Sequence, residues 1–363
     1  LVVTSYDLLR RDEALYEGQE FYACILDEAQ AIKNHTTQKY KAVCKVRSRV
    51  RFALTGTPVE NRLGELWSIF SFLMPGYLPP YKSFCSRFEK PIVQEEDQTA
   101  VRRLNQLTGP FILRRMKSDV LKELPPKTEN VYRIELEEEQ RKLYLAAVVD
   151  AREKLQAAKP EDKMAVFAVL MRLREICCDP RLIADNWEGG SAKLDACAEL
   201  VSSAVEGGHR ILLFSQFTSM LELLAKRLDA EGISHFTLQG STPKPVRAEL
   251  VRRFNGGEVS VFLISLRAGG TGLNLTAADI VIHYDPWWNV AAQNQATDRA
   301  YRIGQQNPVQ VYKLIAQDTI EEKIVELQQA KQSLADTVTG TADGAILSMR
   351  PDELLQLLEG SEP

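Results

Sequence analysis

Five short apolar runs in the second half of the sequence constrain the fold more than any other feature. They occupy residues 210–215, 235–240, 259–265, 279–285 and 309–315. Amphipathic segments with helical spacing, such as SMLELLAKRLDAEG, lie between them. Continuous apolar strands that alternate with amphipathic helices are typical of a parallel sheet with helices on both faces. The second half therefore predicts an α/β lobe built on a parallel sheet.

A smaller set of strand-like runs opens the chain and predicts a second lobe of the same class. These runs are 2–6 (VVTSY), 21–26 (FYACIL) and 50–55 (VRFALT). Between the two lobes, apolar residues recur mostly at helical spacing, which predicts helical insertions. The helical patterns cover 60–74, 137–160, 164–180, 318–334 and 351–360. Thr319 and Glu322 stand at capping-box spacing in the fourth of these.

Composition allows two domains of ordinary size and excludes several classes of protein. None of the 363 residues lies in an apolar run approaching the roughly 20 needed to cross a bilayer, so no membrane partner is expected. The six cysteines form no CxxC pair and the four histidines are scattered, which favours reduced, mostly buried thiols over a zinc site. The first residues lack the pattern of a signal peptide, so we expect a cytoplasmic protein.

Charge gives a mixed indication about nucleic acids. The formal net charge of −4 does not support a basic footprint over the whole molecule. However, the segment 102–127 carries seven Lys and Arg residues against two acids. On its own, that segment fits a solvated helix face as well as a binding surface.

Polar residues follow two neighbouring strands of the first lobe. Asp27 and Glu28 come directly after the run 21–26, where ligands of open parallel sheets bind. One carboxylate could hold Mg²⁺ through water, and the next could activate water for attack on a γ-phosphate. An ordinary loop start fits the pair equally well. The turn Thr55–Thr57 could sense a bound phosphate, although a simple strand-to-helix turn is also compatible.

A glycine-rich loop and an arginine motif follow strands of the second lobe. Gly269, Gly270 and Gly272 would let the backbone approach a phosphate closely. Further on, Gln295, Arg299 and Arg302 recur at intervals of four and three residues. A helix through them would present all three on one face. The two arginines could then stabilise charge on a transferring phosphate.

Taken in order, these strings resemble the motifs of SWI/SNF-type ATPases, the double-stranded-DNA translocases of helicase superfamily two. The resemblance rests on DEAQ, LTGTP, LLFSQF, SLRAGGTGLNL, DPWWN and QATDRAYRIGQ. DEAQAIKN is further similar to bacterial members, for which a nucleoid-associated protein is expected. The family implies two RecA-like parallel-sheet lobes with helical insertions, ATP and Mg²⁺ between the lobes, and sequence-independent contacts to the phosphate backbone of duplex DNA.

The resemblance also implies roles for individual residues. The catalytic group would be Asp27, which holds Mg²⁺ through water, Glu28, which activates water, and the arginines Arg299 and Arg302. Nucleotide binding or its coupling to DNA would involve Gln30, Thr55, Gly56, Thr57, Gly270, Gly272 and Gln295. Contacts to DNA would come from Thr4, Ser5, Tyr6, Ser215, Gln216, Arg267, Gly269, Thr271 and Trp287. The segment PFILRRMKSDVLKELPPK resembles the basic connector between the two lobes of the family. The resemblance therefore implies a function for the Arg114–Arg115 cluster.

The expected domains follow from the same motifs. They are a first lobe at 1–115 with a protrusion at about 61–108, a connector and second protrusion at 116–190, a second lobe at 191–335, and a tail with a short helix at 336–363. Val290 replaces a proline common in the family, and a usual Glu near 292–293 is absent, which should only tune activity. No G-x-x-x-x-G-K-[ST] phosphate loop occurs in the sequence.

Because the family's phosphate loop lies upstream of the acidic pair, we expect a fragment whose first lobe is truncated at its N-terminus and which is inactive alone. Two other functions remain open at this point. One is a strand-separating helicase acting on DNA or RNA, against which the DPWWN element and the two protrusions argue. The other is a non-catalytic DNA-binding or regulatory fragment. The sequence does not identify protein partners.

Overall fold

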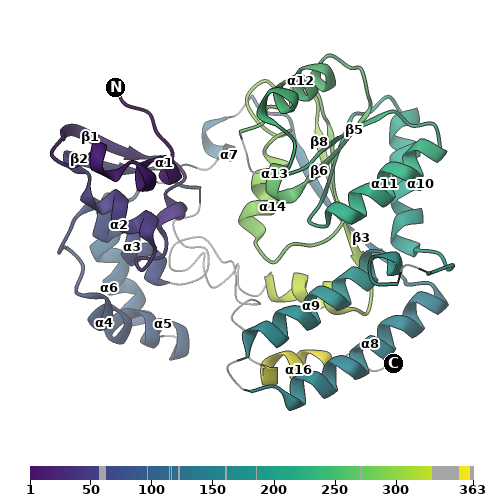
Figure 1. Ribbon diagram of the computed structural model, residues 1–363, viewed down its shortest axis with the longest axis horizontal. Coiled ribbons are helices and arrows are strands. Elements are labelled where there is room, and N and C mark those ends of the chain that lie inside the picture. The colour runs from purple at the N-terminus through teal and green to yellow at the C-terminus, as the bar shows by residue number, and fades with distance from the viewer. Residues whose placement is uncertain are drawn as a thin grey trace. The chain divides into compact units, whose positions relative to one another are not determined.

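The computed structural model describes residues 1–56, 63–95, 97–113, 115, 117–121, 123–159, 162–184, 186–269, 272–328 and 351–359. These residues form two compact units, which divide immediately after Arg115 (Figure 1). Each unit has its own parallel sheet and its own buried core.

The first unit is built on two parallel strands, β1 (Glu20–Leu26) and β2 (Arg47–Ala53). Parallel neighbours need a crossover connection, and α2 (Gln38–Lys45) supplies it. The other helices are α1 (Tyr6–Arg11), α3 (Leu63–Leu73), α4 (Tyr81–Phe84), the π-helical segment Cys85–Glu89, α5 (Lys90–Gln94) and α6 (Gln98–Thr108), with 3-10 turns at Glu13–Leu15, Ala29–Ile32 and Gly109–Phe111. Leu26, Val43 and Phe72 join β1, α2 and α3 in one core.

The prediction of a strand at residues 2–6 is wrong. Residues 1–5 have no regular structure, and Tyr6 begins α1. The hydroxyl of Ser5 accepts a hydrogen bond from the backbone N–H of Leu8 at 3.3 Å. A serine in this position ends the extended segment and caps the helix, which the apolar start of the run concealed. The strand predicted at 50–55 is present but begins earlier, at Arg47.

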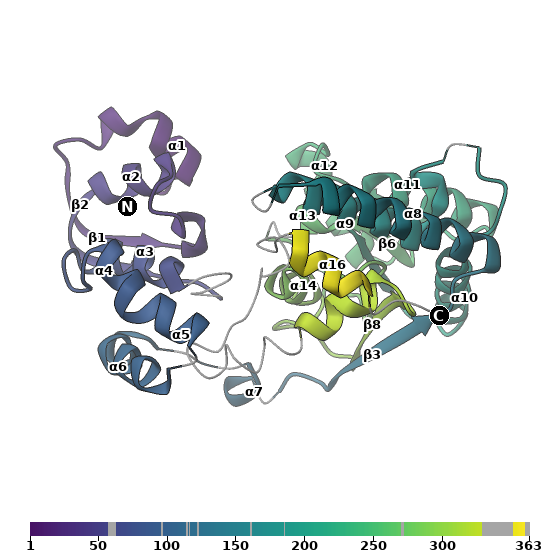
Figure 2. The same ribbon diagram turned by 90° about the horizontal axis from the view of Figure 1, so that it is seen from below.

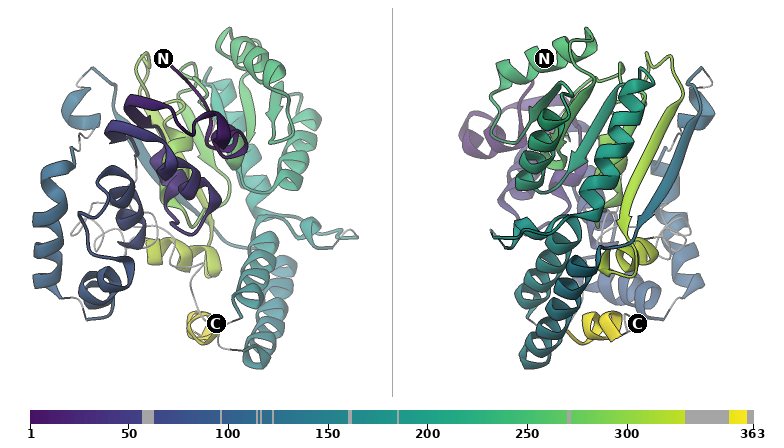
Figure 3. Two further views of the ribbon diagram at one scale, coloured as in Figure 1. Left: turned by 60° about the vertical axis from the view of Figure 1, so that its left-hand side comes forward. Right: turned by 90° about the vertical axis from the view of Figure 1, so that its right-hand side faces the viewer.

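The second unit contains a six-stranded sheet in which every neighbouring pair is parallel. The strands are β3 (Lys127–Ile134), β4 (Ile211–Ser215), β5 (His235–Leu238), β6 (Val261–Ser265), β7 (Ile280–His283) and β8 (Val309–Ala316). Their order is β3-β8-β7-β4-β6-β5 (Figure 3). The prediction of a parallel sheet is therefore confirmed, and the segment before the lobe contributes the edge strand β3.

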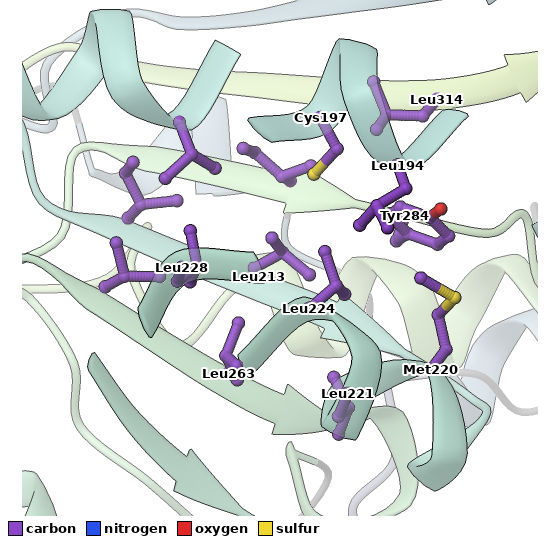
Figure 4. Close-up of a cluster of buried hydrophobic side chains, with 14 of the residues drawn as sticks. Leu194, Cys197, Leu213, Met220, Leu221, Leu224, Leu228, Leu263, Tyr284 and Leu314 are labelled. Carbon is purple, nitrogen blue, oxygen red and sulfur yellow. The ribbon is translucent and has the colours of Figure 1, made fainter. Parts of the chain in front are cut away.

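Helices cover both faces of this sheet. The unit contains the helices α7 (Lys117–Val120), α8 (Glu138–Ala157), α9 (Lys163–Cys178), the 3-10 turn Pro180–Leu182, α10 (Ala192–Glu206), α11 (Thr218–Ala230), α12 (Lys244–Asn255), α13 (Leu266–Gly269), α14 (Val290–Thr297), a helix at 320–328 and α16 (Pro351–Glu359). On one face, side chains of α10 and α11 such as Leu194 and Leu224 pack on Leu213 and Leu263 (Figure 4). On the other, Phe254 of α12 packs on Phe262.

Helices α8 and α9 form a hairpin that carries α16 against it (Figures 1 and 2). Leu354 and Leu358 of α16 are fully buried there. Lys323 Nζ donates to the carbonyl of Leu357 at 2.6 Å, so a cation neutralises the C-terminal end of this helix. No helix in the described ranges is long and apolar enough to span a membrane.

A buried ion pair joins the start of α10 to the helix at 320–328. Lys193 Nζ donates to the carboxylate of Glu321, and neither side chain is exposed. Glu321 Oε2 also accepts the backbone N–H of Ala316 at 2.9 Å. Two charges removed from water in this way are tolerated only as a pair. The pair therefore fixes α10 against the end of β8.

All six cysteines are free, and burial divides them by unit. In the first unit, Cys24, Cys44 and Cys85 are half-buried. In the second unit, Cys177, Cys178 and Cys197 are completely buried. Burial raises the pKa of all six thiols, that of Cys197 to about 12. The three buried thiols pack as small hydrophobic groups, as predicted, whereas burial of the other three is only partial.

His283 is completely buried in the second unit, where its charge state links stability to pH. Its Nε2 lies 2.8 Å from Thr297 Oγ1, and its ring stacks on Phe214. Burial, aided by the nearby Lys313, lowers the pKa of His283 to about 3. An unfolded histidine titrates near pH 6.5, so between these values the unfolded chain binds more protons. Stability should therefore be complete above about pH 6.5 and fall as the pH drops toward 3.

The variant His283→Gln tests this dependence. Between pH 7.5 and pH 5, the native histidine should cost about 2 kcal/mol of stability, and the variant should lose less over the same interval. Urea unfolding followed by circular dichroism at the two pH values measures both losses. Equal losses in the two proteins would contradict the assignment of this pH dependence to His283.

Candidate active site

The acidic pair lies at the carboxyl end of β1, on a turn that is tied to the segment after β2. Asp27 and Glu28 are both exposed. The backbone N–H of Leu54 donates to the carbonyl of Leu26 at 2.7 Å, and that of Ala29 donates to the carbonyl of Leu54 at 2.9 Å. These two bonds extend the parallel pairing past the ends of the strands and hold the acidic turn beside the next turn.

Glu28 has an unusual backbone conformation, with φ 49° and ψ 52°. This left-handed region costs a residue other than glycine roughly 1–2 kcal/mol. Asp27 Oδ1 accepts the backbone N–H of Glu28 at 3.0 Å, which helps to hold the strained turn. Strain of this kind is concentrated at functional sites. The strain at Glu28 therefore favours a functional role for the acidic pair over an ordinary loop start.

Gln30 connects the acidic pair to the turn after β2. Its Nε2 donates to Glu28 Oε2 at 2.6 Å, and its Oε1 accepts the hydroxyl of Thr55 at 2.8 Å. Gly56 follows Thr55 and is exposed. The structure thus brings four predicted residues, Asp27, Glu28, Gln30 and Thr55, together at one sheet end, with Gly56 adjacent. Thr57 lies outside the described residues.

Tyr6 also belongs to this group, although it was predicted as a contact to DNA. Its hydroxyl donates to the backbone carbonyl of Asp27 at 2.7 Å. Burial and the neighbouring carboxylate of Asp27 raise the pKa of Tyr6 to about 12. The phenol is therefore a neutral donor that supports the acidic turn. Thr4 and Ser5, the other residues of this prediction, are exposed.

The donor set at β1 fits magnesium better than a tightly held transition metal. Among the described residues, no group of three or more His, Cys, Asp or Glu side chains could hold a metal ion. Mg²⁺ usually keeps several waters and binds one or two carboxylates together with substrate phosphates. The exposed carboxylate of Asp27 meets that requirement.

In the second unit, polar residues gather where β4 and β7 end. Ser215 Oγ donates to Asp285 Oδ1 at 2.6 Å, and the backbone N–H of Gln216 donates to the same oxygen at 3.2 Å. Burial raises the pKa of Asp285. Trp287 follows two residues later and is half-buried. Ser215 and Gln216, both predicted to contact DNA, are thus bonded to Asp285, which lies two residues before Trp287, a third residue of that prediction.

The glycine-rich loop follows β6. Arg267 is exposed on α13. Gly269 is buried, and a Cβ at this position would lie 2.8 Å from Cε1 of Phe214, so the glycine is needed for close packing of α13 on β4. Gly272 has φ 38°, a conformation that favours glycine. Gly270 and Thr271 lie outside the described residues.

The prediction that one helix presents Gln295, Arg299 and Arg302 is wrong. Helix α14 ends at Thr297, so Gln295 is helical and the arginines lie in the turns beyond it. The carbonyl of Arg299 accepts the backbone N–H of Leu275 at 3.0 Å instead of continuing the helix. Arg299 is buried, and Arg302 Nη1 donates to the carbonyl of Leu273 at 3.2 Å.

The basic connector contacts this arginine motif. Lys117 Nζ lies 2.6 Å from Asp298 Oδ1 and donates to the carbonyl of Tyr301 at 3.3 Å. Arg115 is exposed. Arg114 lies outside the described residues.

Sequence reasoning missed one residue beneath the β4–β7 group. Arg174 of α9 is completely buried, and its Nη2 lies 3.3 Å from Asp285 Oδ2. The sequence could have indicated that Arg174 is buried, because Leu170 and Cys178 lie four residues before and after it on the apolar face of the same helix.

Comparisons with known proteins identify the family models and relatives that this chain matches. Residues 1–182 match the model of the SNF2-related domain, and residues 192–304 match that of the helicase conserved C-terminal domain. The chain is 40% identical to an uncharacterized ATP-dependent helicase of Mycoplasma pneumoniae, over 99% of this chain and 34% of the relative. It is 36% identical to the SWI/SNF-related matrix-associated actin-dependent regulator of chromatin subfamily A member 1 of Mus musculus, over 98% of this chain and 36% of the relative. The chain thus spans about a third of the length of these relatives.

A solved structure, the Sulfolobus solfataricus SWI2/SNF2 ATPase core in complex with dsDNA, is similar to this chain with a TM-score of 0.55 and 35% identity. The match covers 96% of this chain and 75% of that one. Sequence and fold thus give the same assignment: the chain belongs to the SNF2-related family of helicase superfamily two and has an α/β fold with two RecA-like parallel-sheet lobes.

Proposed function

We propose that the protein to which this chain belongs is an ATP-driven translocase or remodeller of double-stranded DNA. The observation that carries the proposal is the hydrogen-bonded series from Glu28 through Gln30 to Thr55. It links a strained, exposed acid to the turn after the neighbouring strand. A series of this kind can pass the state of a bound phosphate from one strand end to the next. The DNA in the complex of the Sulfolobus relative supports duplex as the substrate.

In this proposal, the first unit performs the hydrolytic chemistry. Asp27 would hold Mg²⁺ through water, and the metal would neutralise charge on the ATP phosphates. Glu28 would orient a water and accept its proton during attack on the γ-phosphate. The amide of Gln30 holds the carboxylate of Glu28, and Gly56 and Thr57 would couple the state of the nucleotide to the DNA.

The second unit would stabilise the reaction and grip the DNA. Gln295, Arg299 and Arg302 would face the phosphates, with Gly270 and Gly272 allowing close approach of the backbone. Thr4, Ser5, Ser215, Gln216, Arg267, Thr271 and Trp287 would contact the phosphate backbone. Such contacts carry no sequence information, and binding should weaken steeply with salt. In a bacterium, the protein would work at the nucleoid.

Residues 1–363 by themselves should not hydrolyse ATP, because their sequence has no G-x-x-x-x-G-K-[ST] loop to hold the β- and γ-phosphates. The full-length protein should hydrolyse ATP and be stimulated more by duplex than by single-stranded DNA or RNA. Phosphate release by the two proteins, with each nucleic acid in turn, measures both. Displacement of a triplex-forming strand without separation of the duplex would support translocation. Strand separation without triplex displacement would instead indicate a helicase, and duplex-independent hydrolysis would overturn the proposal.

A further inference from the structure

The buried guanidinium of Arg174 is the least expected charge in the second unit. It lies on α9, in the helical hairpin outside the sheet, yet it reaches the ends of β4 and β7. A charge without exposure needs a close partner to be tolerated. Its partner is Asp285, with Nη2 at 3.3 Å from Oδ2, and the same nitrogen donates to the carbonyl of Pro286.

Arg174 is also held by aromatic rings. Its Cζ lies 4.6 Å from the ring centre of Trp288, 5.8 Å from that of Trp287 and 5.6 Å from that of Phe217. Planar guanidinium groups stack well on such rings, particularly away from water. The arginine therefore contacts Asp285, Pro286, Trp287 and Trp288, four consecutive residues of the loop after β7.

The same carboxylate organises the end of β4. While Oδ2 of Asp285 faces Arg174, Oδ1 accepts the hydroxyl of Ser215 at 2.6 Å and the backbone N–H of Gln216 at 3.2 Å. Ser215 Oγ in turn accepts the backbone N–H of Phe217 at 3.1 Å. One buried ion pair thus sets the position of both strand ends.

We propose that Arg174 is a positioning residue that holds the Ser215–Gln216 turn and the loop 285–288 in the geometry that grips the DNA backbone. The inference rests on the proposed function, because it takes these two segments as the DNA-contacting elements of the second lobe. Arg174 itself is buried and touches no DNA. It makes the helical hairpin α8–α9 part of the DNA grip, since a shift of α9 moves both segments together.

The variant Arg174→Met alone would leave the carboxylate of Asp285 buried without its partner, which is strongly destabilising. The double variant Arg174→Met with Asp285→Asn removes both charges. The amide oxygen can still accept the hydroxyl of Ser215, and the net charge of the protein is unchanged. Its long-range attraction to DNA should therefore equal that of the native chain. The exposed Arg172 on the same helix provides a matched control, as Arg172→Met.

The test measures binding of a labelled 30-base-pair duplex to the full-length protein by fluorescence anisotropy at several salt concentrations. For the double variant, we expect cooperative unfolding near the native temperature and an affinity roughly 10- to 100-fold lower. The slope of log affinity against log salt should stay unchanged, because no cation–phosphate contact is lost. Quenching by duplex of the tryptophan fluorescence, to which Trp287 contributes, should shrink. Arg172→Met should keep the native quenching and an affinity within a few-fold of the native value.

Four outcomes decide the inference. A folded double variant with native affinity and native quenching would overturn it. A salt slope reduced by about one would also overturn it, because it would indicate direct phosphate contact by Arg174. If the double variant does not fold, Arg174→Lys decides: it keeps the charge beside Asp285 but loses the planar stacking group, and native affinity there would overturn the proposal. Failure of the native full-length protein to bind duplex would instead overturn the proposed function, and this inference with it.

Discussion

Glu28→Gln in the full-length protein should lower duplex-stimulated ATP hydrolysis by about 10²- to 10⁴-fold while leaving duplex binding intact. The substitution keeps the shape of the side chain, and its amide oxygen can still accept the hydrogen bond that Gln30 Nε2 donates to Glu28 Oε2. What it removes is the carboxylate that accepts a proton from the attacking water. The turnover number should therefore fall, and the dissociation constant for duplex should not change.

A matched control is available on the same strand. Glu20 is exposed at the opposite, amino end of β1, so Glu20→Gln makes the same chemical change away from the site. Steady-state phosphate release and duplex anisotropy on the two variants measure the effect. If Glu28→Gln retained hydrolysis within a few-fold of the native rate, Glu28 would not be the general base, and the strained turn would need another explanation.

Lys193→Met should destabilise the second unit by about 3–5 kcal/mol. Lys193 and Glu321 are both fully buried, and the variant would leave the carboxylate without the cation that compensates it. Adding Glu321→Gln should recover much of this loss, because the amide oxygen can still accept the backbone N–H of Ala316. The two substitutions should thus be strongly non-additive.

Urea unfolding of the two single variants and the double variant measures this coupling. Lys142→Met serves as the control, since Lys142 forms ion pairs with Glu138 and Glu139 that are mostly exposed. Such surface pairs contribute roughly 0–1 kcal/mol. Equal losses for Lys193→Met and Lys142→Met would show that the buried pair does not stabilise the fold.

The sheets were predictable because their signal is local. Five of the six strands of the second sheet are short apolar runs, and apolar periodicity reports burial directly. The strand predicted at 2–6 is absent for an equally local reason. Ser5 caps helix α1, but the apolar residues before it resemble the start of a strand. The helix predicted through Arg302 is absent because of a contact with a residue far away in the sequence. The carbonyl of Arg299 bonds to Leu275, and sequence spacing carries no information about that contact.

The residues of the site also divide into those that the sequence could predict and those that it could not. Asp27, Glu28, Gln30 and Thr55 follow two strand ends that parallel pairing brings together, so their proximity was predictable from position. Arg174 and Lys193 were not found, because a charged residue in an amphipathic helix is usually read as part of the solvated face. Their partners, Asp285 and Glu321, lie more than a hundred positions away along the chain. Only the fold reveals that these charges are internal.

The distribution of cysteines gives each unit its own chemical reporter. Every half-buried thiol belongs to the first unit, and every completely buried one belongs to the second. A thiol reagent added to the native protein therefore modifies the first unit through small local openings, whereas it reaches the second only when α9 or α10 separates from its core. Peptide mapping of the modified cysteines would distinguish breathing of one unit from unfolding of the other, without any engineered label.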